Sequence, residues 1–145
     1  MDREDAMNID MIRAAARRLE GHVRRTPLLN SPFLDDIAGR RVWVKPECLQ
    51  HTGSFKFRGG WSAVSALDPE VRAKGVIAFS SGNHAQGVAA AAHYAGIPAL
   101  IVMPSDAPAI KRANTAAWGA EIQLYDRFTE NRESLAQSIA KSRGA

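Results

Sequence analysis

The chain has 145 residues, of which 46% are hydrophobic and 23% charged, a composition typical of a globular protein. Its net charge of +4 arises from dispersed basic pairs with acids between them, so we expect no nucleic-acid partner. With Cys48 as the sole cysteine, an acidic N-terminus and no apolar run of membrane-spanning length, we expect a cytoplasmic protein without disulfides or membrane contact.

The first part of the chain combines short helical patterns with extended pieces. The predicted elements are a helix at 8–20, an extended piece at 26–29, a short helix at 32–39 and a strand at 41–45. Asn8 or Asp10 can cap the first helix, and the residue before Pro27 is pushed towards extended conformations. Alternation of apolar residues indicates the strand, which Pro46 stops.

From residue 75 onwards, strands and helices alternate at a spacing of about 22 residues. Strands are predicted at 76–79, 98–103 and 121–125, and helices at 83–94, 109–118 and 129–142. A further helix is predicted at 54–67, capped by Ser54. Strands separated by helices predict right-handed crossovers and a parallel sheet. We therefore expect an α/β fold with a small open parallel sheet, flanking helices and a ligand-binding edge at the carboxyl ends of the strands.

Lys56 stands between Phe55 and Phe57, close to the predicted start of the helix at 54–67. The N-terminal end of a helix disfavours a cation, and two flanking rings would remove water, which lowers the pKa of a lysine. A less cationic lysine suits Schiff-base chemistry with an aldehyde cofactor. An ordinary solvated lysine is the alternative that these residues alone leave open.

The turn at 80–84, Ser-Ser-Gly-Asn-His, follows a predicted strand and opens a predicted helix. Free backbone N–H groups at such a position bind anions, although a plain helix cap explains the same residues. The turn matches neither a Walker loop nor the dinucleotide glycine fingerprint. His51, His84 and His93 fit no standard ligand spacing, so we expect no metal. Lys111 is predicted to lie on a solvated helix face.

Residues 45–59 and 80–84 resemble two segments of the threonine/serine dehydratase family, which are fold-type-II pyridoxal phosphate enzymes. The first is similar to the cofactor-lysine segment of that family and the second to its substrate-binding loop. The family pattern continues through Gly119-Ala120-Glu121, so the resemblance covers nearly the whole chain. It implies that residues 1–52 are N-terminal segments belonging to the large domain and that residues 53–145 form the small cap domain.

The resemblance also implies a role for individual residues. Lys56 would form the Schiff base with pyridoxal 5′-phosphate and then transfer protons. Phe55 would pack against the pyridine ring, and Asn83 would hydrogen-bond the phenolic oxygen of the cofactor. In racemases of the family, the residue matching Ser81 is a second acid or base. The substrate pocket would be lined by Ser81, Gly82, Asn83 and His84.

The implied reaction is β-elimination of a hydroxy amino acid such as threonine, serine or 3-hydroxyaspartate, giving a 2-oxo acid and ammonia. A serine or threonine racemase is the enzymatic alternative, and a non-catalytic module that binds carboxylates or a partner subunit is another. In its full-length form, such an enzyme is expected to be a homo-oligomer.

The glycine-rich loop that holds the cofactor phosphate in this family has no counterpart among the 145 residues. We therefore expect the chain to be the N-terminal portion of a dehydratase-like enzyme. By itself this portion is expected to bind pyridoxal phosphate poorly and to have no useful turnover.

Overall fold

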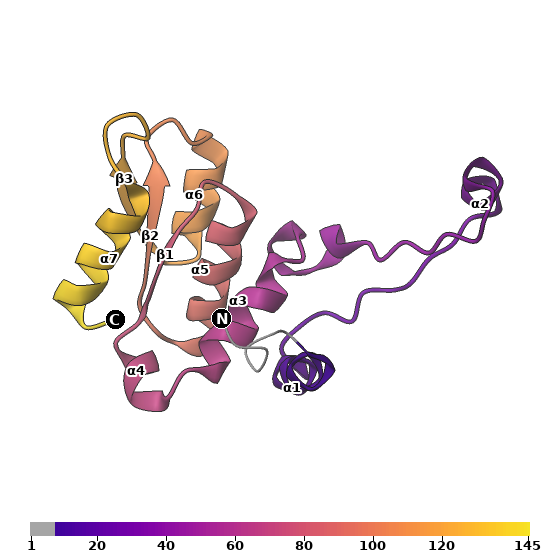
Figure 1. Ribbon diagram of the computed structural model, residues 1–145, viewed down its shortest axis with the longest axis horizontal. Helices are drawn as coiled ribbons and strands as arrows, with labels where there is room; N and C mark the ends of the chain where they lie inside the picture. The colour runs from indigo at the N-terminus through magenta and orange to yellow at the C-terminus, as the bar shows by residue number, and fades with distance from the viewer. Residues whose placement is uncertain (1–7) are drawn as a thin grey trace.

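The computed structural model describes residues 8–145 (Figure 1). Its elements in chain order are α1 (Ile9–Leu19), α2 (Pro32–Ala38), the 3-10 turns η2 (Glu47–Leu49) and η3 (His51–Gly53), α3 (Lys56–Ala66), α4 (Pro69–Ala73), β1 (Val76–Phe79), α5 (Asn83–Ala95), β2 (Ala99–Pro104), α6 (Ala109–Ala117), β3 (Glu121–Tyr125) and α7 (Arg132–Arg143). No helix in this part of the chain is long and apolar enough to cross a membrane.

The three strands form one parallel sheet in the order β1-β2-β3, which confirms the predicted α/β fold. Successive side chains of a strand point to opposite faces of the sheet. Ile101 and Met103 of β2 therefore pack against α5, whereas Leu100 and Val102 pack towards α7. Helices α5 and α6 cover one face and α7 the other (Figure 1).

Helices α3 and α5 cross at unusually short range because glycines face each other at the crossing. A Cβ atom on Gly60 would lie 2.6 Å from the carbonyl oxygen of Gly87. A Cβ atom on Gly87 would in turn lie 2.8 Å from the carbonyl carbon of Lys56. Only glycine permits such an approach of two backbones. The crossing therefore fixes the first turn of α3 against α5.

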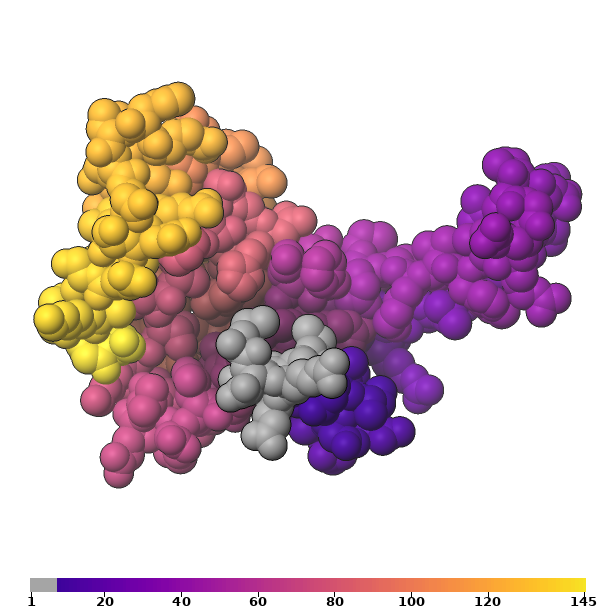
Figure 2. All heavy atoms as spheres, in the orientation of Figure 1, coloured from indigo at the N-terminus to yellow at the C-terminus, as the bar shows by residue number. Residues whose placement is uncertain are grey.

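The N-terminal third of the chain is less compact. Helix α1 packs on α3, where the indole N–H of Trp61 donates to the carbonyl oxygen of Arg18 at 2.8 Å. The segment 27–45, with α2 at its far end, projects from the body (Figures 1 and 2). Phe33 and Ile37 of α2 are 81% and 85% exposed. This projecting segment thus presents apolar side chains that residues 8–145 do not cover.

The strand predicted at 41–45 is wrong. Leu29 and Val44 form one isolated antiparallel bridge, with N–H to oxygen distances of 2.9 and 2.7 Å. Two short segments without a third strand beside them do not form a stable sheet. Apolar residues alternate in 41–45, but only Val44 has a pairing partner.

Helix ends agree with the prediction to within two residues at most positions. The side chain of Asn8 accepts from the N–H groups of Asp10 and Met11 at 3.0 Å each, as predicted for a cap. Helix α3 begins at Lys56 and not at Ser54, whose hydroxyl accepts from the Lys56 N–H at 3.4 Å. Helix α4 was not predicted, although the proline after Asp68 suits the first turn of a helix.

Candidate active site

Lys56 is the first residue of α3 and is half-buried. Its Nζ atom lies 4.7 Å from the ring centroid of Phe55, which is 58% exposed. Phe57 is fully buried and packs with Trp61 in the cluster between α3 and α5. The expectation of two rings flanking the lysine is therefore wrong, since successive residues of a helix point about 100° apart. One aromatic ring lies beside the amine.

The turn at 80–84 lies at the carboxyl end of β1, as predicted. The N–H of Ser80 donates to the carbonyl oxygen of Val102 at 3.1 Å, which continues the sheet into the turn. Gly82 occupies the N-cap position of α5 and has no side chain with which to cap the helix. The first N–H groups of α5 therefore remain available to an acceptor, and the exposed side chains of Ser81, Asn83 and His84 surround them.

The fold brings Lys56 and this turn together. The backbone of Lys56 contacts Gly87, one helical turn beyond the start of α5. Partial loss of hydration lowers the pKa of His84 below its usual value, although the side chain still reaches solvent, and the charge of Lys56 lowers it further. At neutral pH, His84 therefore offers a neutral imidazole beside the lysine amine.

Two further cations lie near the turn, and the sequence did not reveal them. Lys111 was predicted to be solvated, but its Nζ lies 3.2 Å from the point where a Cβ atom on Gly82 would stand. Arg132 places its guanidinium carbon 5.0 Å from the ring centroid of Phe79, the last residue of β1. Both residues are distant in sequence from the turn, so no local motif signalled them. They make the carboxyl end of β1 electropositive, which suits an anionic ligand.

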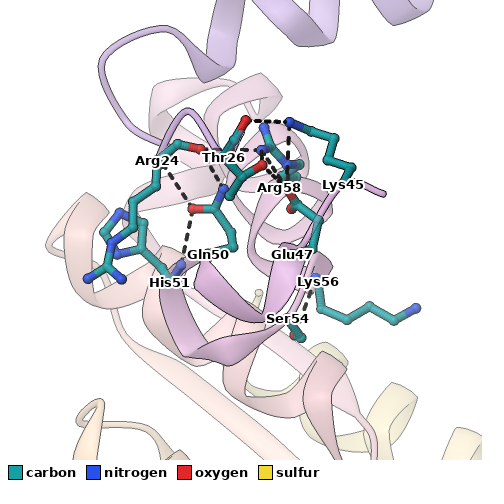
Figure 3. Close-up of polar contacts among 9 residues, drawn as sticks. All are labelled: Arg24, Thr26, Lys45, Glu47, Gln50, His51, Ser54, Lys56 and Arg58. Atoms are coloured by element: carbon teal, nitrogen blue, oxygen red, sulfur yellow. Dashed lines mark hydrogen bonds and ion pairs between the residues drawn. The ribbon is translucent and has the colours of Figure 1, made fainter. Parts of the chain in front are cut away.

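A polar network joins the start of α3 to the preceding segments (Figure 3). Arg58 donates to both carboxylate oxygens of Glu47, from Nε at 2.7 Å and from Nη2 at 2.8 Å. The hydroxyl of Thr26 donates to the same carboxylate at 2.6 Å. The amide of Gln50 bonds the backbone N–H and carbonyl of Arg24 at 3.0 and 2.8 Å. Glu47, Gln50 and Arg58 lie within the segment 45–59, but their contacts were not predicted from the sequence.

Glu47 should make the stability of the fold depend on pH in the acid range. Its hydrogen bonds with Arg58 hold its pKa at about 2, against an ordinary 4.5, and Thr26 adds to the effect. A lowered pKa means that the pair stabilises the fold fully above pH 4.5 and that this contribution is lost as the pH falls towards 2. After allowance for solvent screening, its size is on the order of 1–2 kcal/mol.

Urea unfolding of the wild type and of Glu47→Gln measures this contribution. The stability gap between the two is expected to narrow between about pH 6 and about pH 2.5. Glu121→Gln is the matched comparison: the pKa of Glu121 is also lowered by its hydrogen bonds with Arg143, but this pair is exposed to solvent, so its stability gap should be the smaller one at every pH. An unchanged gap for Glu47→Gln across this range would contradict the assigned ionisation.

No group of three or more His, Cys, Asp or Glu side chains within residues 8–145 is arranged to hold a metal ion. The donors that are present are a lysine amine beside an exposed aromatic ring, a helix N-terminus and two further cations. An amine that can condense with an aldehyde and a flat ring that can pack on a heteroaromatic one suit pyridoxal 5′-phosphate. The residues that would surround its reactive carbon thus fit the cofactor.

Comparison with known proteins agrees with this chemistry. Residues 19–145 match the family described as pyridoxal-phosphate dependent enzyme. The chain belongs to this family. It is 53% identical over 135 residues to the L-threo-3-hydroxyaspartate ammonia-lyase of a Pseudomonas species, covering 93% of this chain and 42% of the relative. The serine racemase of Oryza sativa is 44% identical, with coverage of 97% and 41%.

Solved structures give the same result for the fold. Maize serine racemase superimposes with a TM-score of 0.91 at 43% identity, covering 97% of this chain and 43% of that one. A T.th. threonine deaminase gives a TM-score of 0.82 at 46% identity, covering 95% and 43%. The expected membership of the fold-type-II enzymes is therefore confirmed. The chain spans about two-fifths of the length of the curated relatives that it matches.

Proposed function

We propose that this chain is part of a pyridoxal phosphate-dependent lyase that eliminates the β-hydroxyl of a small hydroxy amino acid. Threonine, serine and 3-hydroxyaspartate are the candidate substrates, and a 2-oxo acid and ammonia are the products. The observation that carries the proposal is the packing of the Lys56 backbone against Gly87 of α5, a helix whose N-terminus is uncapped, in a chain of this family. Relatives named ammonia-lyases of L-threo-3-hydroxyaspartate and L-threonine support it.

Three residues would hold the cofactor. Lys56 would bind it covalently through Nζ, the exposed ring of Phe55 would pack beside it, and Asn83 would hydrogen-bond its phenolic oxygen. When bound, pyridoxal phosphate supplies an electron sink for the charge that develops at the α-carbon. The chain supplies position: Lys56, a half-buried residue at the start of α3, moves the α-proton with its Nζ atom.

The turn at 80–84 would bind the α-carboxylate of the substrate. Its uncapped N–H groups point outwards from the helix, and the side chains of Ser81, Asn83 and His84 add hydrogen-bonding groups around Gly82. Lys111, beside Gly82, adds positive charge without occupying the turn. A carboxylate held there is pulled towards the helix dipole, which orients the α-carbon relative to Lys56.

Racemisation is the second candidate, because the relatives include serine racemases and Ser81 is exposed on the turn. A racemase needs a second acid or base besides Lys56, and Ser81 would fill that role. Ser81→Ala is expected to lower D-serine formation at least about tenfold and to change elimination by less than about threefold.

The full-length protein and L-serine provide the assay, with chiral chromatography for D-serine and a coupled assay for the 2-oxo acid. Ser142→Ala, in the last turn of α7, is a matched serine control. D-serine formation in excess of 2-oxo acid by the wild type would reverse the order of the two candidates. Equal loss of both activities in Ser81→Ala would remove the acid or base role of Ser81.

We also propose a division into two domains and assembly into a homo-oligomer. The body formed by α3 to α7 supports a cap domain at 53–145, and the projecting segment supports the assignment of 1–52 to a larger domain (Figure 1). The exposed side chains of Phe33 and Ile37 support burial by a further part of a longer protein or by a second subunit of a homo-oligomer. A cytoplasmic location is consistent with Cys48, which is free and exposed.

A further inference from the structure

The side chain of Lys56 makes no hydrogen bond or ion pair with another residue of 8–145, so the backbone of α3 sets its position. We propose that the ion pair between Glu47 and Arg58 is a clamp that positions Lys56 for reaction with an aldehyde. This inference rests on the proposed function, because it assumes that Lys56 is the residue that binds the cofactor. Glu47 and Arg58 are thereby positioning residues and not catalytic ones.

The clamp has the geometry of a rigid contact. Both carboxylate oxygens of Glu47 accept from the guanidinium, at 2.7 and 2.8 Å, and the two side chains are only 17% and 26% exposed. Two parallel hydrogen bonds fix the direction of the guanidinium as well as its distance. A flexible surface pair would not fix this direction.

The clamp also reaches a third segment of the chain. Arg58 Nη2 donates to the carbonyl oxygen of Arg24 at 3.3 Å, and Thr26 donates its hydroxyl proton to Glu47. Lys45 Nζ donates to the carbonyl oxygen of Thr26 at 3.0 Å. Segments 24–26 and 45–50 are thus joined to the first turn of α3. Because these segments precede α3 in the chain, they anchor its start from outside the helix.

The position of the clamp on the helix explains what it controls. Arg58 is two residues after Lys56, so the two side chains leave the helix on roughly opposite sides. Figure 3 shows Lys56 extending away from the network that contains Glu47 and Arg58. The backbone of Lys56 is also packed against Gly87 of α5. The first turn of α3 is therefore held by the clamp and by the glycine crossing, and the rotation of α3 sets the direction of the amine.

The chain contains a matched control for this clamp. Arg143 donates to both carboxylate oxygens of Glu121 at 2.8 and 3.0 Å, with side chains 47% and 56% exposed. This pair joins the end of α7 to the start of β3, two elements that share no extensive packing with α3. It has the same chemistry and also two hydrogen bonds between guanidinium and carboxylate, from Nη1 and Nη2, but its loss should not turn Lys56.

The test measures how fast Lys56 of the full-length protein binds pyridoxal 5′-phosphate. Samples are reduced with borohydride at timed intervals, and the labelled Lys56 peptide is quantified by mass spectrometry. Glu47→Ala and Arg58→Ala are expected to slow labelling at least about tenfold, since small displacements of a reacting group cost large factors in rate. Arg58→Lys keeps the charge but loses the two-point contact, so it should fall between Arg58→Ala and the wild type. Glu121→Ala should label at the wild-type rate.

Turnover provides a readout that a loss of folding would not mimic. A displaced amine should lower kcat and leave the KM of the amino acid within about threefold, because the substrate turn at 80–84 is intact. Circular dichroism establishes that each variant is folded, and Glu47→Gln, which keeps the shape of Glu47, replaces Glu47→Ala should the latter fail to fold. Wild-type labelling rates in folded Glu47 and Arg58 variants would overturn the clamp alone. Failure of the wild type to label at Lys56 would overturn the proposed function and the clamp with it.

Discussion

Replacing Lys56 with alanine is expected to abolish covalent attachment of pyridoxal 5′-phosphate to the full-length protein. The amine is the only group on the first turn of α3 that can condense with an aldehyde, and it lies half-buried beside the exposed ring of Phe55. Borohydride trapping followed by peptide mass spectrometry measures the attachment. Lys141→Ala, on the exposed face of α7, is the matched control and should retain full labelling.

The same variant should leave the fold almost unchanged. The Lys56 side chain has no hydrogen bond or ion pair to lose within residues 8–145, so the stability cost of its truncation should stay below about 0.5 kcal/mol. Binding of a simple carboxylate at the turn at 80–84 should also persist. Loss of cofactor attachment with retained carboxylate binding indicates an enzyme, because a non-catalytic carboxylate-binding module would have no attachment to lose. Borohydride-stable label at another lysine in Lys56→Ala, at the wild-type level, would disprove the assignment.

Gly60→Ala is expected to destabilise the protein by about 1–3 kcal/mol, because overpacking of a close contact costs that much. The added Cβ would stand 2.6 Å from the carbonyl oxygen of Gly87, which is backbone and cannot turn aside. Helices α3 and α5 must therefore separate, and the first turn of α3, with Lys56, must move with them. Urea unfolding measures the loss of stability, and borohydride trapping measures the accompanying loss of labelling.

The neighbouring residue provides the control for this prediction. Gly59 lies on the same helix, and a Cβ atom there would meet nothing within 4 Å. Gly59→Ala should therefore stabilise the protein by up to about 1 kcal/mol, as glycine is a poor helix former. A loss of stability in Gly60→Ala and a gain in Gly59→Ala would be hard to explain without the close crossing of α3 and α5. Equal stability of the two variants would rule out the crossing as a determinant of the fold.

Sequence periodicity predicted the regular half of the fold well. Strands and helices from residue 75 onwards lie within three residues of their expected bounds, because β1 and β2 are short apolar runs, β3 alternates between polar and apolar residues, and each helix has a glycine behind it. The elements before residue 53 were harder to predict from the sequence. An alternating run at 41–45 does not show whether a partner strand exists, and Val44 forms only one bridge with Leu29.

Only those parts of the candidate site that lie within a short stretch of sequence were predicted. Lys56 and the turn at 80–84 each lie within one short stretch of sequence, and the packing of α3 on α5 brings the two stretches together. Contacts between distant residues were missed, namely Lys111 against Gly82 and Arg58 with Glu47, since spacing along the chain does not encode them. The direction of Phe57 was mistaken for a related reason: alternation with Phe55 says nothing about which face of α3 meets α5.

The most direct test of the proposed function uses the full-length protein with pyridoxal 5′-phosphate and L-threo-3-hydroxyaspartate, L-threonine and L-serine in turn. Ammonia and 2-oxo acid are measured together. We predict that at least one substrate yields the two products in equal amounts and that Lys56→Ala yields neither. Absence of both products with all three substrates, from a wild type that carries the cofactor on Lys56, would contradict the proposed elimination.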